Sequence, residues 1–284
     1  MQTRTAIVGL SLLALSGVAY AESGWSSSIT PYGRYQFETD LDDAGSFSVI
    51  RTGAAFKTGG AVTDTVFGAI AFDAEYSNYD SNDTSIPSDF VFIDFRPSVS
   101  VNLNENLSVF GGLILGAGGE PDADVGDSLM YGGFAGFNYQ LAKGVSVGTG
   151  VGFTTQLEDD AIILPLLNLT WAISDNLTLE ANGLSAKLSY KVDDAWTVFA
   201  EGSYEFRQYR LADDAAIASG VFSDEWVPLG VGVSYTPADN ITVSVSGGAI
   251  VWQQVEFFDD DENSLSEIDA DVTGYVSASV KIAW

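Results

Sequence analysis

The sequence predicts an all-β protein: a single antiparallel up-and-down transmembrane β-barrel of about fourteen strands, with twelve strands as the alternative. Three observations lead to this prediction. Apolar and polar residues alternate with a period of two, short turns alternate with long acidic connections, and helical periodicity is missing from residue 22 onward. Because successive side chains of a strand point to opposite faces, a wall between lipid and a polar interior requires this alternation.

Residues 1–21 are predicted to be a secretory signal peptide. Arg4 precedes an apolar run over residues 6–18, and Ala19-Tyr20-Ala21 is a small-x-small cleavage site. The apolar run is shorter than the ~20 residues that a membrane-spanning helix needs. The chain has no Cys, so neither a lipid-anchoring Cys nor a disulfide is available. We therefore expect export and a barrel over residues 22–284, in the cell outer membrane of a Gram-negative-type bacterium.

Fourteen segments have the alternation of a strand, and their lengths bracket the ~9–11 residues that a tilted transmembrane strand needs. The predicted strands cover residues 28–38, 46–57, 65–77, 90–103, 107–117, 129–141, 145–156, 161–173, 177–183, 185–192, 196–210, 225–236, 241–257 and 268–284.

The connections between these segments are of two kinds. Long acidic connections, such as residues 118–128 and 259–267, alternate with short turns, the pattern of extracellular loops and periplasmic turns in outer-membrane barrels. The short turns are predicted at residues 58–61, 104–106, 142–144, 174–176, 193–195 and 238–240. A hairpin reversing at Gly183-Leu184-Ser185 brings the count to fourteen strands, whereas an irregular segment there would leave twelve.

The segment from Gly274 to Trp284 alternates apolar with small or polar residues and ends on an aromatic. It looks like the closing strand of an outer-membrane barrel, of the kind that the barrel assembly machinery recognises. We expect it to pair with the first strand near residues 29–37. Four aromatic residues beside short turns are predicted to form an interfacial girdle: Trp171, Trp196, Tyr235 and Trp284.

A soluble, secreted β-sandwich is the competing architecture, because its strands also alternate. The barrel is favoured because the polar faces include glycine runs such as Gly148, Gly150 and Gly152, which suit a crowded interior.

Most of the chain after residue 21 resembles a known family, most strongly from about Ser128 onward. The residues that carry the likeness are 164–171 (LPLLNLTW), 174–177 (SDNL), 188–190 (LSY), 196–198 (WTV) and 230–235 (GVGVSY). They are similar to those of bacterial outer-membrane β-barrels that carry a domain of unknown function. The resemblance implies a fold and a location, and it supplies neither an activity nor site residues.

The composition excludes several classes of function. The chain has no His, which hydrolytic triads generally need, so we predict that it is not an enzyme. Without His or Cys, zinc and copper sites are improbable, and we predict no cofactor and no dedicated metal site. The acidic runs at residues 122–124 and 259–263 lack EF-hand spacing for calcium. A net charge of -28 repels nucleic acid.

The inward faces are the place to look for function. Large inward residues are predicted at Phe110, Phe134, Phe199, Trp226 and Trp252. By the two-residue period, charged residues of both signs are predicted to line the lumen: Arg34, Arg51, Asp73, Glu75, Asp94, Arg96, Glu180, Lys187, Glu201, Glu205, Arg207 and Lys281.

Two functional hypotheses remain open. The first is a porin-like passive channel for small solutes, with a mild cation preference arising from the acidic loops. The second is a non-conducting structural or surface-interaction barrel whose acidic loops bind divalent cations or surface polysaccharide. In both cases we expect contact with outer-membrane lipid, lipopolysaccharide and, during biogenesis, the barrel assembly machinery.

Overall fold

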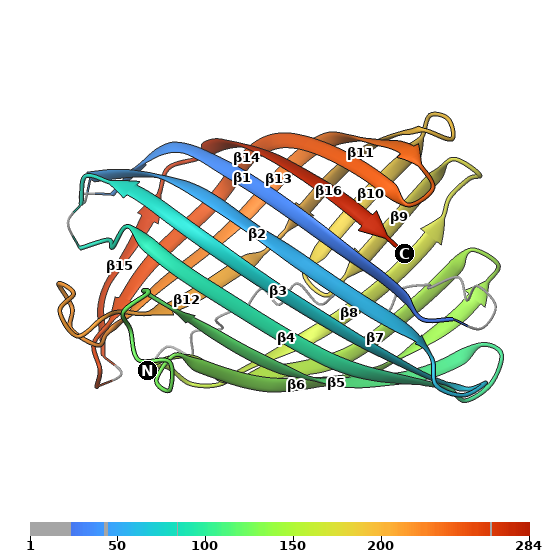
Figure 1. The fold of residues 1–284 in the computed structure, drawn as a ribbon, viewed down its shortest axis with the longest axis horizontal. Coiled ribbons are helices and arrows are strands. Elements are labelled where there is room, and N and C mark those ends of the chain that lie inside the picture. Colours follow the sequence, from blue (N-terminus) through green and yellow to red (C-terminus); the bar gives the residue numbers. More distant parts are fainter. Residues whose placement is uncertain (1–23, 43–44, 84, 262) are drawn as a thin grey trace.

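A computed structural model describes residues 24–42, 45–83, 85–261 and 263–284, so the predicted signal peptide lies outside the described residues. These residues form one closed antiparallel barrel (Figure 1). Its strand elements are β1 (Ser26–Leu41), β2 (Gly45–Ala61), β3 (Val66–Ser81), β4 (Asp89–Asn102), β5 (Leu107–Gly119), β6 (Leu129–Ala142), β7 (Val145–Thr154), β8 (Ile162–Ala172), β9 (Leu177–Asn182), β10 (Ser185–Lys191), β11 (Trp196–Ser203), β12 (Glu205–Arg210), β13 (Val221–Ala238), β14 (Ile241–Phe258), β15 (Ser264–Ala270) and β16 (Thr273–Ala283).

The sixteen elements correspond to fourteen barrel strands. β11 and β12 follow one another along β13 with only Tyr204 between them, and β15 and β16 do the same along β14. The β9–β10 hairpin reverses at Gly183, whose φ of 59° suits glycine. The predictions of the fold class and of fourteen strands are therefore confirmed. No helix in the described part of the chain is long and apolar enough to cross a membrane.

The barrel closes between its first and last strands. β1 pairs with β16 from Ser28–Ala283 to Gln36–Tyr275, so the predicted pairing of the closing strand is confirmed. Closure satisfies the backbone hydrogen bonds along both of these strands and leaves neither as a free edge of the sheet.

Three local predictions were wrong. Residues 58–61 are not a turn, because they continue the ladder with β3, and the chain reverses at residues 62–65 instead. β13 begins at Val221, four residues earlier than predicted, since residues 221–224 pair with both β12 and β14. Trp252 does not point inward: a bulge between β13 and β14 shifts the alternation, and the side chain is 38% exposed.

The two ends of the barrel differ in their connections. One end, called here the turn end, carries short reversals such as residues 103–106 and 143–144, and it lies at the right in Figure 1. The other, the loop end, carries longer segments such as 120–128 and 211–220. The outer surface is apolar: Ile163, Leu167 and Val231 are among many exposed aliphatic side chains on it.

β12 connects two distant parts of the wall. β9 and β10 contain only 6 and 7 residues, so they form the wall over only part of the height of the barrel. Toward the loop end, β12 pairs with β13 on one side and meets β5 on the other, where Arg210 and Gly119 are parallel partners. This approach needs glycine, because a Cβ on Gly118 would collide with the backbone carbonyl of Gln208.

Several apolar clusters fill the interior toward the loop end, and β12 contributes to two of them. The largest, called here the loop-half core, joins inward side chains from opposite walls: Leu41, Phe47, Val49, Tyr79, Ile86, Phe90, Tyr209, Leu211, Phe222, Val255 and Phe257. A second contains Ile114 of β5, three residues of β8 and Phe206 of β12. β12 therefore contributes side chains to both of these clusters.

Candidate functional site

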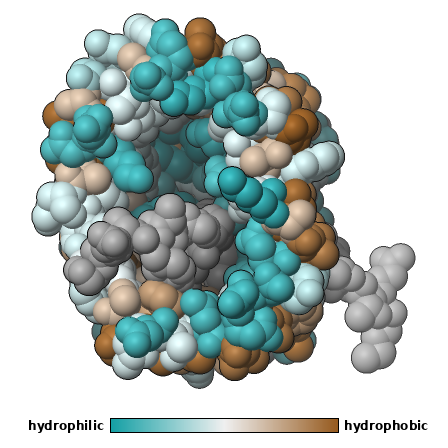
Figure 2. All heavy atoms as spheres, turned by 90° about the vertical axis from the view of Figure 1, so that its right-hand side faces the viewer, coloured by the Kyte–Doolittle hydropathy of each residue, from teal (hydrophilic) through white to brown (hydrophobic). Residues whose placement is uncertain are grey.

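Toward the turn end the interior is hollow and polar. A cavity of about 340 Å³, called here the vestibule, is lined mainly by inward residues of β1–β4, β12 and β16. Figure 2 looks into the turn end and shows hydrophilic side chains around a hollow. The vestibule lining includes eight residues that the sequence placed in the lumen: Arg34, Arg51, Asp73, Glu75, Asp94, Arg96, Glu205 and Arg207.

A buried polar network, called here the floor, separates the vestibule from the loop-half core. The Arg51 guanidinium lies 2.5 Å from the Asp224 carboxylate and also donates to Gln36 and Tyr79. Tyr79 donates to Asp224 at 2.6 Å, and Gln253 donates to the other carboxylate oxygen at 2.8 Å. Gln36 completes the ring by donating to Gln253 at 2.6 Å. The floor thereby joins β1–β3 to β13 and β14 across the barrel.

The space above the floor, toward the loop end, is closed by stacked aromatic rings. Phe90 of β4 stacks on Tyr209 of β12, with ring centroids 4.3 Å apart, and on Phe222 of β13 at 5.3 Å. All three rings are completely buried. The stacked rings therefore exclude water from this part of the loop half.

Further charge pairs line the vestibule below the floor. The Arg207 guanidinium lies 3.2 Å from the Glu75 carboxylate, and Arg34 lies 3.0 Å from Glu205. The Tyr32 hydroxyl lies within hydrogen-bonding distance of both Asp73, at 2.9 Å, and Glu75, at 3.1 Å. Opposite charges from β1, β3 and β12 therefore face one another across the barrel axis.

A separate charged group lies on the short strands. The Lys187 ammonium is 3.1 Å from the Glu201 carboxylate and lies over the Phe199 ring. Glu180 is the β9 partner of Lys187, so all three charges share the inward face of β9–β11. They lie outside the vestibule lining.

The turn end of the vestibule is basic. Arg96 pairs with Asp94 at 2.6 Å, while Lys57 lines the cavity with its side chain exposed. Lys281 follows the lining residues Ser277 and Ser279 on the same face of β16.

Tyr32, Lys57 and Asp224 are among the residues of this interior that sequence reasoning missed. Lys57 was detectable, because it is six residues after Arg51 and therefore on the same face of β2. Tyr32 likewise shares a face with Arg34. Asp224 was missed because the predicted strand began one residue after it.

The predicted interfacial aromatics lie near the turn end on the outer surface. Trp171, Trp196, Tyr235 and Trp284 are all exposed, and the Trp196 and Tyr235 rings are in contact, with centroids 4.5 Å apart. Their place relative to a membrane interface stays a prediction.

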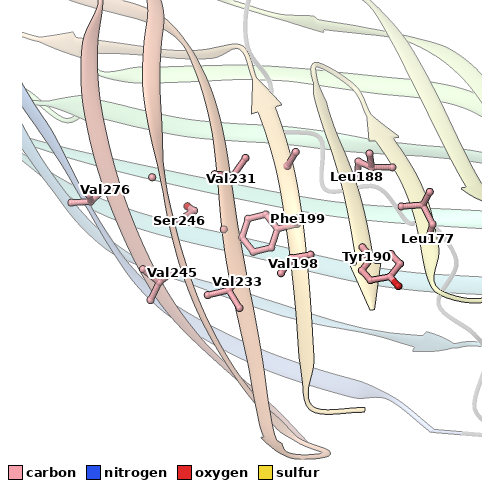
Figure 3. Close-up of a pocket in the computed structure, with 13 residues that line it drawn as sticks. Leu177, Leu188, Tyr190, Val198, Phe199, Val231, Val233, Val245, Ser246 and Val276 are labelled. Atoms are coloured by element: carbon pink, nitrogen blue, oxygen red, sulfur yellow. The ribbon is translucent and has the colours of Figure 1, made fainter. Parts of the chain in front are cut away.

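A shallow apolar depression of about 730 Å³ lies on the same outer surface (Figure 3). Small residues such as Ala200 and Gly247 sit there between exposed Val231, Val245 and Val276. Its apolar lining suits contact with lipid, and it is distinct from the vestibule.

The acidic loop at residues 259–263 is organised by its own hydrogen bonds. The backbone N–H and side-chain amide of Asn263 donate to the Asp259 carboxylate and lower its pKa below the usual value. Within the described residues, no group of three acidic side chains is placed to hold a metal ion.

Comparison with solved structures identifies the fold as that of outer-membrane β-barrels. The chain is similar to a Pseudomonas aeruginosa FadL homologue, with 12% identity, a TM-score of 0.50, and 91% of this chain and 90% of that chain covered. It is also similar to the COG4313 outer membrane channel from Pseudomonas putida F1, with 10% identity, a TM-score of 0.50, and 95% and 100% covered.

The chain belongs to the family described as "Domain of unknown function (DUF6268)", which matches residues 62–281. This match confirms the resemblance found in the sequence. A search of curated proteins finds no match.

Proposed function

We propose that this protein is an outer-membrane channel for small solutes, opened by displacement of the loop-half core. The observation that carries the proposal is the vestibule: a polar cavity with charges of both signs, inside a closed barrel whose outer surface is apolar. The proposal includes export by the signal peptide, contact with outer-membrane lipid and lipopolysaccharide, and no catalytic step.

The element that would move is β12 with its connection to β13. It contacts β5 through the Arg210–Gly119 pairing, and its Tyr209 packs against Phe90. Because β9 and β10 are short, the edge of β12 that faces β5 has a single paired position at this height, Arg210 with Gly119. Moving β12 therefore breaks fewer backbone hydrogen bonds than moving any full-length strand.

A mild cation preference is part of the proposal, and it arises at the loop end. Acidic residues of the long connections raise the local concentration of cations there. The ion pairs of the vestibule cancel within themselves, so the proposed preference requires the acidic loops to outweigh the basic turn end.

The test is single-channel recording in planar bilayers, with a disulfide as the switch. The chain has no Cys, so the pair Gly119→Cys and Arg210→Cys introduces a single crosslink between β5 and β12. We expect brief openings of the wild-type protein with a cation-selective reversal potential, loss of openings in the oxidised variant and their return on reduction. The two single-Cys variants are the controls.

A non-conducting structural barrel is the second candidate, and the complete burial of Phe90, Tyr209 and Phe222 favours it. It predicts silence of the wild-type protein and of the reduced variant alike. It also predicts that shortening loops 118–128 and 259–267 weakens binding of divalent cations or polysaccharide at the surface. Silence in both proteins would overturn the channel proposal.

A further inference from the structure

The basic residues of this acidic protein are concentrated inside the barrel. The chain has 11 Lys and Arg against 39 Asp and Glu, and Arg4 lies outside the described residues. Three of the others, Lys143, Lys191 and Arg210, lie at turns or in the loop half. The remaining seven are on inward faces: Arg34, Arg51, Lys57, Arg96, Lys187, Arg207 and Lys281.

Five of these seven cations are paired with a carboxylate. The pairs are Arg34–Glu205, Arg51–Asp224, Arg96–Asp94, Lys187–Glu201 and Arg207–Glu75. Lys57 and Lys281 form no ion pair with any described residue. Both lysines are exposed residues, at the turn end of the interior.

Strand register brings these two lysines close together. Lys57 of β2 is opposite Ser28 of β1. On the other side of β1, Ile29 faces Ile282 and Tyr32 faces Ser279, so the same register sets Thr30 opposite Lys281. Only β1 therefore separates the two lysines, which are offset by two residues along it, a distance that long side chains span.

Arg96 extends this positive region across the sheet. Lys57 is opposite Ala71 of β3, and Ala71 is opposite Arg96 of β4. The charges of Lys281 and Arg96 both repel Lys57, and Asp73 attracts it only in part. Lys57, Lys281 and Arg96 therefore lie near one another on the inner face of the barrel. The nearby carboxylates already have partners, because Asp94 pairs with Arg96 and Asp73 accepts a hydrogen bond from Tyr32.

We propose that Lys57 and Lys281 form a binding subsite for the oxyanion group of a small solute, a carboxylate or a phosphate. The hydroxyls of Thr30 and Ser279, which line the vestibule nearby, supply further donors. An oxyanion bound there accepts a charge-assisted hydrogen bond from each ammonium group, and its negative charge offsets the repulsion between them. The role of the subsite in solute passage rests on the proposed channel function, whereas the binding itself does not.

The test is isothermal titration calorimetry of the folded full-length barrel in detergent micelles, with succinate and inorganic phosphate as separate probes. We expect saturable binding that weakens with rising salt. The double variant Lys57→Gln with Lys281→Gln should weaken it about tenfold or more, since two charge-assisted contacts are lost. The probe that binds more tightly identifies the oxyanion.

The matched control is the double variant Lys143→Gln with Lys191→Gln, which removes the same charge from turns outside the vestibule. It should bind as the wild type does, and Lys57→Arg with Lys281→Arg should retain binding. Equal loss in both Gln variants, or no binding of either probe to the wild type, overturns the subsite. Binding without conductance would contradict the channel and leave the subsite standing.

Discussion

The loop half and the turn half of this barrel are built from the same strands, yet their interiors are opposite in character. Along β2, the inward residues Phe47 and Val49 lie in the loop-half core, Arg51 lies in the floor, and Lys57 faces the vestibule. Along β2, eight residues from Val49 to Lys57 therefore separate the dry, packed interior from the charged cavity. β2 keeps the same alternation through both halves, so alternation by itself does not decide whether a barrel is filled.

The difference follows from how the opposite walls meet. In the loop half, β12 and β13 come close enough to β4 for aromatic rings to stack, and this excludes water. In the turn half the walls stay apart, and long Arg, Glu and Tyr side chains reach across the space instead. Long polar side chains can extend into a hollow, while apolar rings need direct contact to be buried.

The largest expected effect is the loss of an aromatic ring from the loop half. Phe90→Ala removes a completely buried ring that stacks on Tyr209 and Phe222, so it should lower the free energy of unfolding by about 3–5 kcal/mol. Urea unfolding in lipid vesicles measures this change. Phe137→Ala is the control: that ring is 45% exposed on the outer surface, and its loss leaves no internal cavity. Equal losses would mean that the loop half is not a packed core.

The next comparison is between ion pairs in the two halves. Asp224→Ala leaves the buried Arg51 guanidinium without its carboxylate and should cost about 3–5 kcal/mol of unfolding free energy. Glu201→Gln breaks the partly exposed pair with Lys187 and should cost less than about 1 kcal/mol, because solvent screens that pair. The same unfolding assay gives both values. A large effect at Glu201 would show that the turn half depends on its charge pairs for stability.

The smallest effect concerns the rim of the loop end. Donors from Asn263 lower the pKa of Asp259, so the ionised carboxylate stabilises its loop at neutral pH. This contribution is fully present above the pKa of the unfolded chain and is lost as the pH falls through the lower pKa of the folded loop. The protection of the Asn263 backbone amide, which is its intrinsic hydrogen-exchange rate at each pH divided by the observed rate, should fall as the pH is lowered through the pKa of the folded loop. Asp259→Asn should show low protection at every pH, and a protection that does not change with pH in the wild type would refute this.

Most of the wall was predictable because it depends on local patterns. The hairpin at residues 183–185 was correctly predicted, because two short strands that reverse there keep the neighbouring turns at the same end, although an irregular segment would have done so too. Errors occurred where a partner strand overrode local sequence. Residues 58–61 contain turn-forming Gly and Thr but continue a ladder, and the bulge beside Trp252 reverses the alternation that the sequence implied.

The candidate site was only partly predictable for a related reason. Inward residues follow from the period of two, so eight lining residues of the vestibule were named in advance. Their pairing was not, because Arg34 and Glu205 are 171 residues apart and meet only across the closed barrel. The contact of β12 with β5 was not predictable either, because it depends on the short lengths of β9 and β10.

The sequence by itself determined the fold class, the closing pair and most faces of the strands, and it favoured fourteen strands over twelve, because side-chain alternation and turn chemistry act over a few residues. Only the tertiary structure decided that aromatic rings pack the loop half, that five inward cations are paired, and that Lys57 and Lys281 form no ion pair with a described residue. Those outcomes depend on distances between opposite walls, which arise only once strands far apart in the chain have joined into one barrel.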